Sequence, residues 1–511
     1  MGAMDVSADV AATRPVEPCG ARRLVLLLSV IWLVHAAALL AVEYPPLQDY
    51  PNHLLRQHVL RRIHQVPVYK KYLAVEEGFR PNLLSDWVMQ GVGWGVDLKT
   101  AGKITLLLGL ALGMAAVGFY VSTFGGGAMA ALAGAQLLTS WVFLKGNLNF
   151  HAAGSILLLY LGVLHRIGGR VGWKGLSLLA GLSVLCACAH GFVFGALCGL
   201  VVMATVSGRL GKKQMVLVTV SLLPAILLVA RFGWQQMDRS GLVNRSVVYA
   251  SGLQDLLLWT PLTIWERFDL WWDRILGLGI WCAIAVGAGW TLKRAREGDE
   301  SARVLLGLAF AAVLLYFAVP DRLSSGWGHM KYRVAYLLAM LAMPMIGRIP
   351  PCRPRRVVGA LLVGAVVVSH ALLFSSYREV SSEIRSFVSL STAIPRGSLI
   401  LTVDLTPTDQ SVRPLLHIWS YLCIERDCLS PFLFATQYIQ QLYFIGSLTV
   451  PVSGEGPPES WEDVLRVVQE GDYGGLAVRG RSQEGETLLT EGLERMAANP
   501  SGSVFVRRKG S

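Results

Sequence analysis

The chain has 511 residues, of which 53% are hydrophobic and only 16% are charged, and its formal net charge is +12. Soluble domains contain about 25% charged residues, so this composition excludes a soluble enzyme, a disordered chain and a fibrous protein. Eight cysteines are too few for a disulfide-based fold. The sequence therefore predicts an integral membrane protein with no nucleic-acid partner, because membrane topology accounts for the excess of basic residues.

Eleven apolar runs predict membrane-spanning helices, although several are shorter than the roughly 20 residues that cross a bilayer core. The first run follows Arg22 and Arg23 and lacks the small residues of a cleavage site, which favours a retained helix over a signal peptide. Around His190, two short spans and one broken element both fit the pattern. The predicted spans are residues 24–42, 104–123, 128–144, 152–164, 176–189, 192–206, 215–230, 275–292, 304–319, 334–346 and 357–374.

The distribution of Lys and Arg orients these spans. With the N-terminus inside, five short cytosolic segments hold 17 Lys and Arg against 6 Asp and Glu, as the positive-inside rule requires. An odd number of spans then places the C-terminus outside. This divides the chain into a cytosolic tail (1–23), a transmembrane module (24–375) with large outer loops at about 44–102 and 233–273, and an outer domain (376–511).

The last 135 residues differ from the rest in charge, with 12 Lys and Arg against 16 Asp and Glu. Residues 398–403 and 475–478 are typical of short buried strands, and residues 460–469 of an amphipathic helix. These segments predict a small α/β domain. Cys423 and Cys428 lie in it, and either a disulfide or two unpaired thiols fits their spacing.

The first outer loop begins with an acid, an imidazole and a guanidinium within eight residues, namely Asp49, His53 and Arg56. Asp49 and His53 are one helical turn apart, so both side chains face the same side if the segment after Pro51 is helical. This pattern favours a site at the membrane surface. The alternative is that Asp49 only caps a helix next to the membrane.

The outer loop before the span at 334–346 is basic where topology does not require it. It carries His329, Lys331 and Arg333, with Trp327 beside them. Charged side chains near a bilayer are costly, which favours a functional role, and Arg and Lys are suited to bind a lipid phosphate. The alternative is that they are snorkelling anchors. We rank Arg333 first as a phosphate ligand, and Trp327 is a candidate for stacking on a sugar.

In architecture and motifs, the chain resembles the GT-C-type membrane glycosyltransferases, and among them a largely uncharacterised bacterial branch. The shared architecture is one helix, a long outer loop that starts with an acid, many short helices and an outer C-terminal domain. The motifs that carry the resemblance are Gln48-Asp49-Tyr-Pro-Asn-His53, Pro81-Asn82-Leu-Leu-Ser-Asp86 and Lys145-Gly146-Asn147-Leu-Asn149-Phe150. The resemblance does not name the sugar.

The resemblance implies inverting transfer of a sugar from a polyprenyl-phosphate donor to a glycan, lipid or protein acceptor, at the outer face of a bacterial inner membrane. On the family's pattern, Asp49 is the general base. Relatives often carry two adjacent acids there, whereas Gln48 and Tyr50 flank Asp49. We therefore take Asp86 as the candidate second acid, with a capping role as the alternative. The candidate ligands of the donor phosphate are His53, Arg56, His329, Lys331 and Arg333.

A divalent metal stays open as a cofactor. Asp49, His53 and Asp86 offer suitable ligand types, but no metal-ligand spacing in the sequence supports such a site. Two other functions remain: a transporter or flippase of a lipid-linked or small polar substrate, and a structural component whose C-terminal domain binds partners. Against a transporter, the polar clusters lie at outer helix ends, and no inverted repeat is visible.

Overall fold

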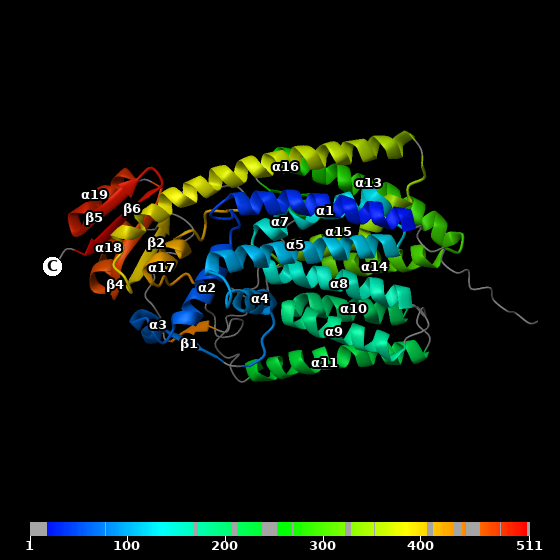
Figure 1. Cartoon of the computed structure of the whole chain (residues 1–511), viewed down its shortest axis with the longest axis horizontal. Helices are drawn as coiled ribbons and strands as arrows, with labels where there is room; N and C mark the ends of the chain where they lie inside the picture. Colours follow the sequence, from blue (N-terminus) through cyan, green and yellow to red (C-terminus); the bar gives the residue numbers. More distant parts are fainter. Residues whose placement is uncertain are drawn as a thin grey trace, which may run out of the picture.

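The computed structural model describes residues 18–76, 78–167, 172–206, 212–237, 253–267, 270–321, 329–351, 353–405, 412–433, 442–445, 460–480 and 482–507. These residues form a bundle of long helices with a small α/β unit at one end (Figure 1). The predicted fold class, a polytopic helical bundle with a C-terminal α/β domain, is confirmed.

Each predicted span coincides with a helix. Among the described residues, 8 helical segments are long and apolar enough to cross a membrane, and one of them, Gly127–Leu144, combines α6 with the short helix α7 (Trp141–Leu144). α9, α10 and α15 are shorter. The helices are α1 (Pro18–Ala41), α5 (Leu98–Thr123), α6 (Gly127–Leu138), α8 (Leu148–Ile167), α9 (Trp173–Ala189), α10 (Gly191–Val206), α11 (Lys212–Met237), α13 (Leu270–Arg296), α14 (Glu300–Ala318), α15 (Met330–Ala342) and α16 (Arg353–Val388).

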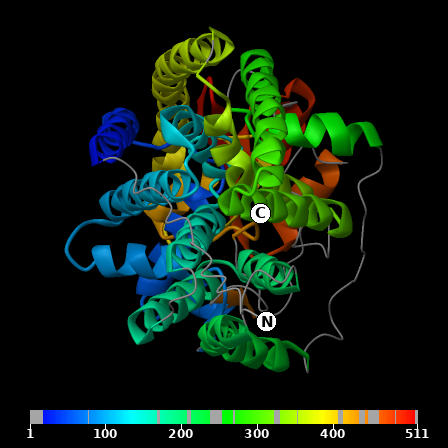
Figure 2. The ribbon, with the colours of Figure 1, turned by 90° about the vertical axis from the view of Figure 1, so that its right-hand side faces the viewer.

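Burial separates central helices from peripheral ones. The span at Leu148–Ile167 is 78% buried inside the protein, whereas the span at Met215–Gln235 is only 22% buried, so α11 offers most of its surface to lipid. Seen along the bundle, α1 and α11 accordingly lie at its edge (Figure 2). His190 separates α9 from α10 with an extended backbone, φ −161° and ψ 114°, so this stretch is two short helices.

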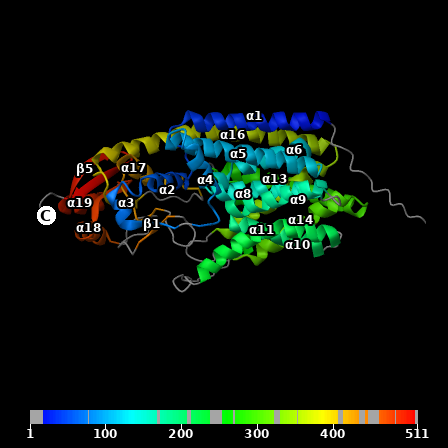
Figure 3. The same ribbon diagram turned by 60° about the horizontal axis from the view of Figure 1, so that its bottom comes forward.

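The segment between α1 and α5 folds at the end of the bundle that carries the α/β unit. It forms α2 (Tyr50–Arg62), α3 (Pro67–Tyr72), β1 (Leu73–Val75) and α4 (Leu84–Val92). α2 lies between the bundle and the α/β unit, and α3 lies beside that unit (Figures 1 and 3). The remaining short elements are α7 (Trp141–Leu144), η2 (Asp255–Trp259), α12 (Thr260–Thr263), η3 (Met343–Arg348), η4 (Ser389–Ala393) and β3 (Leu442–Phe444).

The α/β unit, here called the C-terminal domain, contains one sheet in the order β2-β4-β6-β5. In that order its strands are Leu399–Asp404, Tyr473–Arg479, Gly502–Arg507 and Leu493–Asn499. β2 and β4 are parallel, and the other pairs are antiparallel. The helices are α17 (Trp419–Arg426), α18 (Trp461–Glu470) and α19 (Gln483–Gly492). The strands predicted at 398–403 and 475–478 and the helix at 460–469 are thus present.

One continuous helix connects the bundle to the C-terminal domain. α16 has 36 residues, which at 1.5 Å per residue spans about 54 Å. It runs from the far end of the bundle into the C-terminal domain (Figures 1 and 3) and continues past residue 376, where the sequence placed the domain boundary. The domain is therefore joined to the membrane part by a rigid element.

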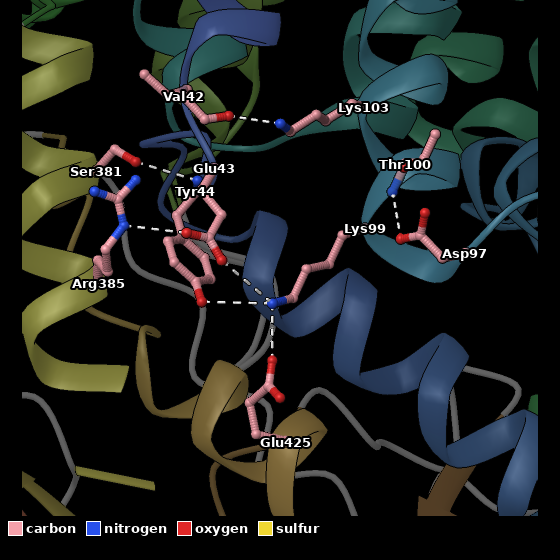
Figure 4. Close-up of polar contacts among 10 residues, drawn as sticks. All are labelled: Val42, Glu43, Tyr44, Asp97, Lys99, Thr100, Lys103, Ser381, Arg385 and Glu425. Carbon is pink, nitrogen blue, oxygen red and sulfur yellow. Dashed lines mark hydrogen bonds and ion pairs between the residues drawn. The ribbon is translucent and has the colours of Figure 1, made fainter. Parts of the chain in front are cut away.

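Polar contacts hold the C-terminal domain against α1 and α5 (Figure 4). The ammonium of Lys99 on α5 lies 2.8 Å from Glu425 Oε1 on α17 and 3.7 Å from Glu43 Oε1, which follows α1. It also donates to the Tyr44 hydroxyl at 3.4 Å. From α16, Arg385 Nε donates to Glu43 Oε2 at 3.1 Å. The residues just after α1 are thus fixed from three sides.

The same domain also contacts α2 and β1. β1 pairs antiparallel with β3, and on α2 both His58 and Arg62 contact the carboxylate of Asp427, with His58 Nε2 at 2.9 Å. Near this contact, Cys423 and Cys428 are buried free cysteines whose Sγ atoms are 2.7 Å apart. The first loop and the C-terminal domain therefore form one packed layer over the end of the bundle.

Candidate active site

Asp49 lies in the turn between α1 and α2, and backbone contacts fix its position. Asp49 N donates to the carbonyl of Lys145 at 3.2 Å, and Gln48 N donates to the carbonyl of Leu144 at 2.9 Å. Gly146 has φ +77°, and a Cβ there would lie 2.8 Å from Asp49 N, so this close approach requires glycine. Two of the sequence motifs therefore meet at Asp49.

The carboxylate of Asp49 does not act as a side-chain cap. Asp49 occupies the N-cap position of α2, yet in the described part of the chain its side chain makes no hydrogen bond to the helix. It is instead 17% exposed and lies 3.5 Å from His417 Nε2. Burial raises the pKa of Asp49 to about 6, although the positive charges of Lys145, His53 and Arg333 act to lower it. A carboxylate of this kind can accept a proton near neutral pH.

Arg333 enters the site from the start of α15. Its guanidinium lies over the ring of Phe150, 5.7 Å from the centroid, and Nη1 donates to Met330 Sδ at 3.8 Å. Its Nε is buried and has no hydrogen-bond partner among the described residues. A buried donor without a partner costs about 1–3 kcal/mol, so such groups call for an explanation such as a ligand.

An aromatic wall connects His329 with Lys145. Trp141 stacks on Tyr332 with ring centroids 5.3 Å apart, and the His329 ring lies 6.0 Å from Trp141. The ammonium of Lys145 lies 5.8 Å from the centre of the Trp141 ring. His329 is therefore on the side of the site that holds Lys145. Trp327, the candidate for stacking on a sugar, lies outside the described residues.

Lys331 points away from this group. Its ammonium donates to the main-chain carbonyls of Tyr316 at 2.5 Å and Phe317 at 3.3 Å, at the C-terminal end of α14. Lysine is favourable there because it satisfies carbonyls that have no partner within the helix. The phosphate role predicted for Lys331 would require these hydrogen bonds to be given up.

Asp86 on α4 and Arg56 on α2 form a buried ion pair beside His53. Arg56 Nη2 donates to Asp86 Oδ2 at 2.5 Å and lies 2.9 Å from His53 Nδ1. Gln57 Nε2 donates to the second oxygen, Oδ1, at 3.2 Å. Burial acts to raise the pKa of Asp86, but Arg56 and His53 outweigh it and hold the pKa well below its usual range. Asp86 is therefore a weak base, with both of its oxygens occupied.

His53 connects this ion pair to Asp49. Its Nδ1 lies 3.7 Å from Asp86 Oδ1, and its charge also acts on Asp49. Asn149 fixes the segment that carries Asp86, since its Oδ1 accepts from Ser85 N at 2.7 Å and its Nδ2 donates to Asn82 O at 2.6 Å. All three quoted motifs thus contact one another.

Two residues at Asp49 were not among the predicted site residues. Lys145 follows α7 and belongs to a quoted motif, but a lysine at a helix end usually only marks the membrane interface. His417 lies in the C-terminal domain, more than 350 positions from Asp49, and no local spacing connects the two. Among the described residues, no group of three or more His, Cys, Asp or Glu side chains is placed to hold a metal ion.

No protein-family model and no curated protein matches the chain. Solved structures do match it. ArnT from Cupriavidus metallidurans bound to undecaprenyl phosphate is 11% identical, with TM-score 0.57, over 96% of this chain and 99% of that chain. Its apo state gives 12% identity and TM-score 0.54 over 95% and 98%. The apo oligosaccharyltransferase of Archaeoglobus fulgidus gives 11% identity and TM-score 0.51 over 89% and 69%.

The chain has the GT-C fold. ArnT and the oligosaccharyltransferase are both GT-C membrane glycosyltransferases, so the resemblance inferred from the sequence is confirmed for the fold. At identities of 11–12%, the likeness establishes the arrangement of the GT-C helices and of the C-terminal domain. A fold of this kind does not determine the activity, which depends on the residues of the chain's own site.

Proposed function

We propose that the protein is a membrane glycosyltransferase that transfers a sugar from a polyprenyl-phosphate donor to an acceptor hydroxyl, with inversion at C1. The observation that carries this proposal is the largely buried carboxylate of Asp49 with three basic side chains, Lys145, His53 and Arg333, around it. The reaction needs a base for the acceptor and positive charge for the leaving phosphate, and this site supplies both. The undecaprenyl phosphate bound to ArnT, which has the same fold, supports a lipid-phosphate donor.

Asp49 acts as the general base. The acceptor oxygen attacks C1 of the sugar from the face opposite the phosphate, and the bond between C1 and the phosphate oxygen breaks. The acceptor proton passes to the carboxylate of Asp49, and polyprenyl phosphate leaves with one additional negative charge. Because burial raises the pKa of Asp49 to about 6, the carboxylate is ionised at pH 7 and yet basic enough to take this proton.

Arg333 and Lys145 bind the donor phosphate. A guanidinium suits two oxygens of a phosphate, whereas an ammonium acts as a point charge. His329 lies beside the same aromatic wall and contributes a further donor. We assign Asp86 a positioning role, in which it holds the side chains of His53 and Arg56 in place.

The site faces the outer side of the membrane. This orientation follows from the basic segments assigned to the cytosol, and it places Asp49, the C-terminal domain and the acceptor in the same compartment. The acceptor is then a glycan, a lipid or a protein of that compartment.

A donor panel tests the function. Purified full-length protein in lipid nanodiscs is incubated with synthetic undecaprenyl-phosphate hexoses, pentoses and amino sugars, radiolabelled in the sugar, and with cell envelopes from a deletion strain as acceptor. We expect one donor to release undecaprenyl phosphate while its label moves to the envelope fraction. Transport of intact donor across proteoliposomes with no bond broken would instead support a flippase.

The pH dependence of transfer follows from Asp49. The base must be deprotonated, and its pKa is raised to about 6, so kcat should be constant above roughly pH 7 and fall about tenfold per unit below pH 6. If Asp49 had the pKa of an exposed aspartate, kcat would fall only below about pH 4. The measurement is kcat between pH 4.5 and 8 with saturating donor, and a constant kcat down to pH 5 would contradict the assignment.

A further inference from the structure

A stretch of the C-terminal domain runs along the loop that carries Asp49. Arg413 N donates to Gln48 Oε1 at 2.9 Å. Four residues later, His417 Nε2 lies 3.5 Å from Asp49 Oδ1. After that, Ser420 Oγ donates to Asn52 Oδ1 at 3.3 Å. Together these three contacts fix the position of residues 413–420 against Asp49 and the start of α2.

The contact between His417 and Asp49 is buried. The side chains of His417 and Asp49 are 10% and 17% exposed, respectively. Burial, together with the positive charges of Lys145 and His53, lowers the pKa of His417 to about 3. The imidazole is therefore neutral near pH 7 and can donate from one ring nitrogen only.

We infer that His417 is a positioning residue for Asp49, which it holds through Nε2–H, so that the C-terminal domain completes the active site. This inference rests on the proposed function, in which Asp49 is the base. A neutral imidazole at Oδ1 orients the carboxylate, which the side chain of Gln48 also contacts. It does so without the positive charge that would make Asp49 a weaker base.

The other charged groups that face Asp49 come from the membrane part of the chain. They are Lys145 after α7, His53 on α2 and Arg333 on α15. His417 is the contribution of the C-terminal domain, and α17, which begins just after it, is tied to α5 through Glu425 and Lys99 (Figure 4). A shift of the C-terminal domain would therefore move His417 relative to the carboxylate of Asp49.

Infrared titration of the full-length protein tests this coupling without knowledge of the sugar. The carboxylic-acid band that Asp49→Asn removes reports the protonation of Asp49, with a midpoint expected near pH 6 in the unmodified protein. A hydrogen bond to a carboxylate favours its ionised form, so its loss in His417→Leu should raise the midpoint by about one pH unit. His417→Gln, whose amide nitrogen can take the place of Nε2, should restore the original midpoint.

His58→Leu is the matched control. His58 also joins the first loop to the C-terminal domain, through Asp427 at 2.9 Å, so its loss loosens the same interface without touching Asp49. Its midpoint should stay near 6. An unchanged midpoint in His417→Leu, an equal shift in His58→Leu, or no recovery in His417→Gln would each overturn the inference.

Kinetics separate this inference from the function on which it rests. With an active donor, His417→Leu should lower kcat about tenfold or more and leave KM for the donor unchanged. Full transfer by Asp49→Asn would refute the role of Asp49 as the general base, on which this inference rests, even if the infrared coupling were present. If Asp49→Asn lost transfer while His417→Leu kept the kcat of the unmodified protein, only the role of His417 would be refuted.

Discussion

An Asp49→Asn variant is expected to lose sugar transfer by about 10²- to 10⁴-fold in kcat, the range that a general base contributes. The amide is close to the carboxylate in shape, so the backbone contacts of this turn to Leu144 and Lys145 should persist. The measurement is the single-turnover rate with the donor that the panel identifies. Affinity for undecaprenyl phosphate should be retained, because the variant removes a negative charge from beside the phosphate site.

Asp86→Asn is the control for this variant. It removes the charge that pairs with buried Arg56, and breaking a buried ion pair costs about 3–5 kcal/mol of stability. We therefore expect a lower melting temperature in Asp86→Asn and an unchanged one in Asp49→Asn. A wild-type rate in Asp49→Asn would exclude Asp49 as the base, and a stable Asp86→Asn that has lost only catalysis would restore Asp86 as a catalytic acid.

An Arg333→Met variant is expected to bind undecaprenyl phosphate about 10- to 100-fold more weakly. A hydrogen bond to a charged group is worth about 1.5–3 kcal/mol, and each 1.4 kcal/mol is tenfold in Kd. The folded protein should tolerate the change, because the Nε that is lost has no partner in the described part of the chain. The measurement is the Kd of undecaprenyl phosphate for the full-length protein in nanodiscs.

Lys331→Met is the control for Arg333→Met. It removes a positive charge from the same helix without removing a proposed phosphate ligand. Lys331 is only two positions away, but its ammonium caps α14 through the carbonyls of Tyr316 and Phe317. We therefore expect a lower melting temperature and an unchanged Kd. A weaker Kd in Lys331→Met with no effect in Arg333→Met would reverse the assignment.

Hydropathy was sufficient to predict the membrane part of the fold. Each apolar run is helical because a helix is the structure in which a single segment satisfies all its backbone hydrogen bonds within itself in a bilayer. Around His190 the sequence left two short spans or one broken element open. The structure has two helices there, and this choice depends on how the helices pack. The extent of α16 beyond residue 376 was missed, although its continuation has an amphipathic helical pattern. The apolar residues that recur there at three- and four-residue spacing are Tyr377, Val380, Ile384, Phe387 and Val388.

The site was predictable where it is local in the chain. Asp49, His53 and Arg56 share one short segment, and α2 indeed begins directly after Asp49. Lys331 and Arg333 were treated alike as loop residues. Both lie on α15, and positions two apart on a helix point in nearly opposite directions, so one of them had to face away from the site.

His417 was not predictable because its position depends on long-range packing. Nothing in its neighbourhood in the sequence indicates a site. It reaches Asp49 only because α16 carries the C-terminal domain over the end of the bundle and the domain then docks on α2 (Figure 1). The same holds for Lys145, which approaches Asp49 because Gly146 permits close contact with that turn.

The most direct test of the central claim is a cryo-electron microscopy structure of the full-length protein with undecaprenyl phosphate bound. We predict that the phosphate contacts Arg333 and Lys145, and that one sugar ring fits between it and the carboxylate of Asp49. A phosphate bound elsewhere, or separated from Asp49 by much more than one sugar, would contradict the account.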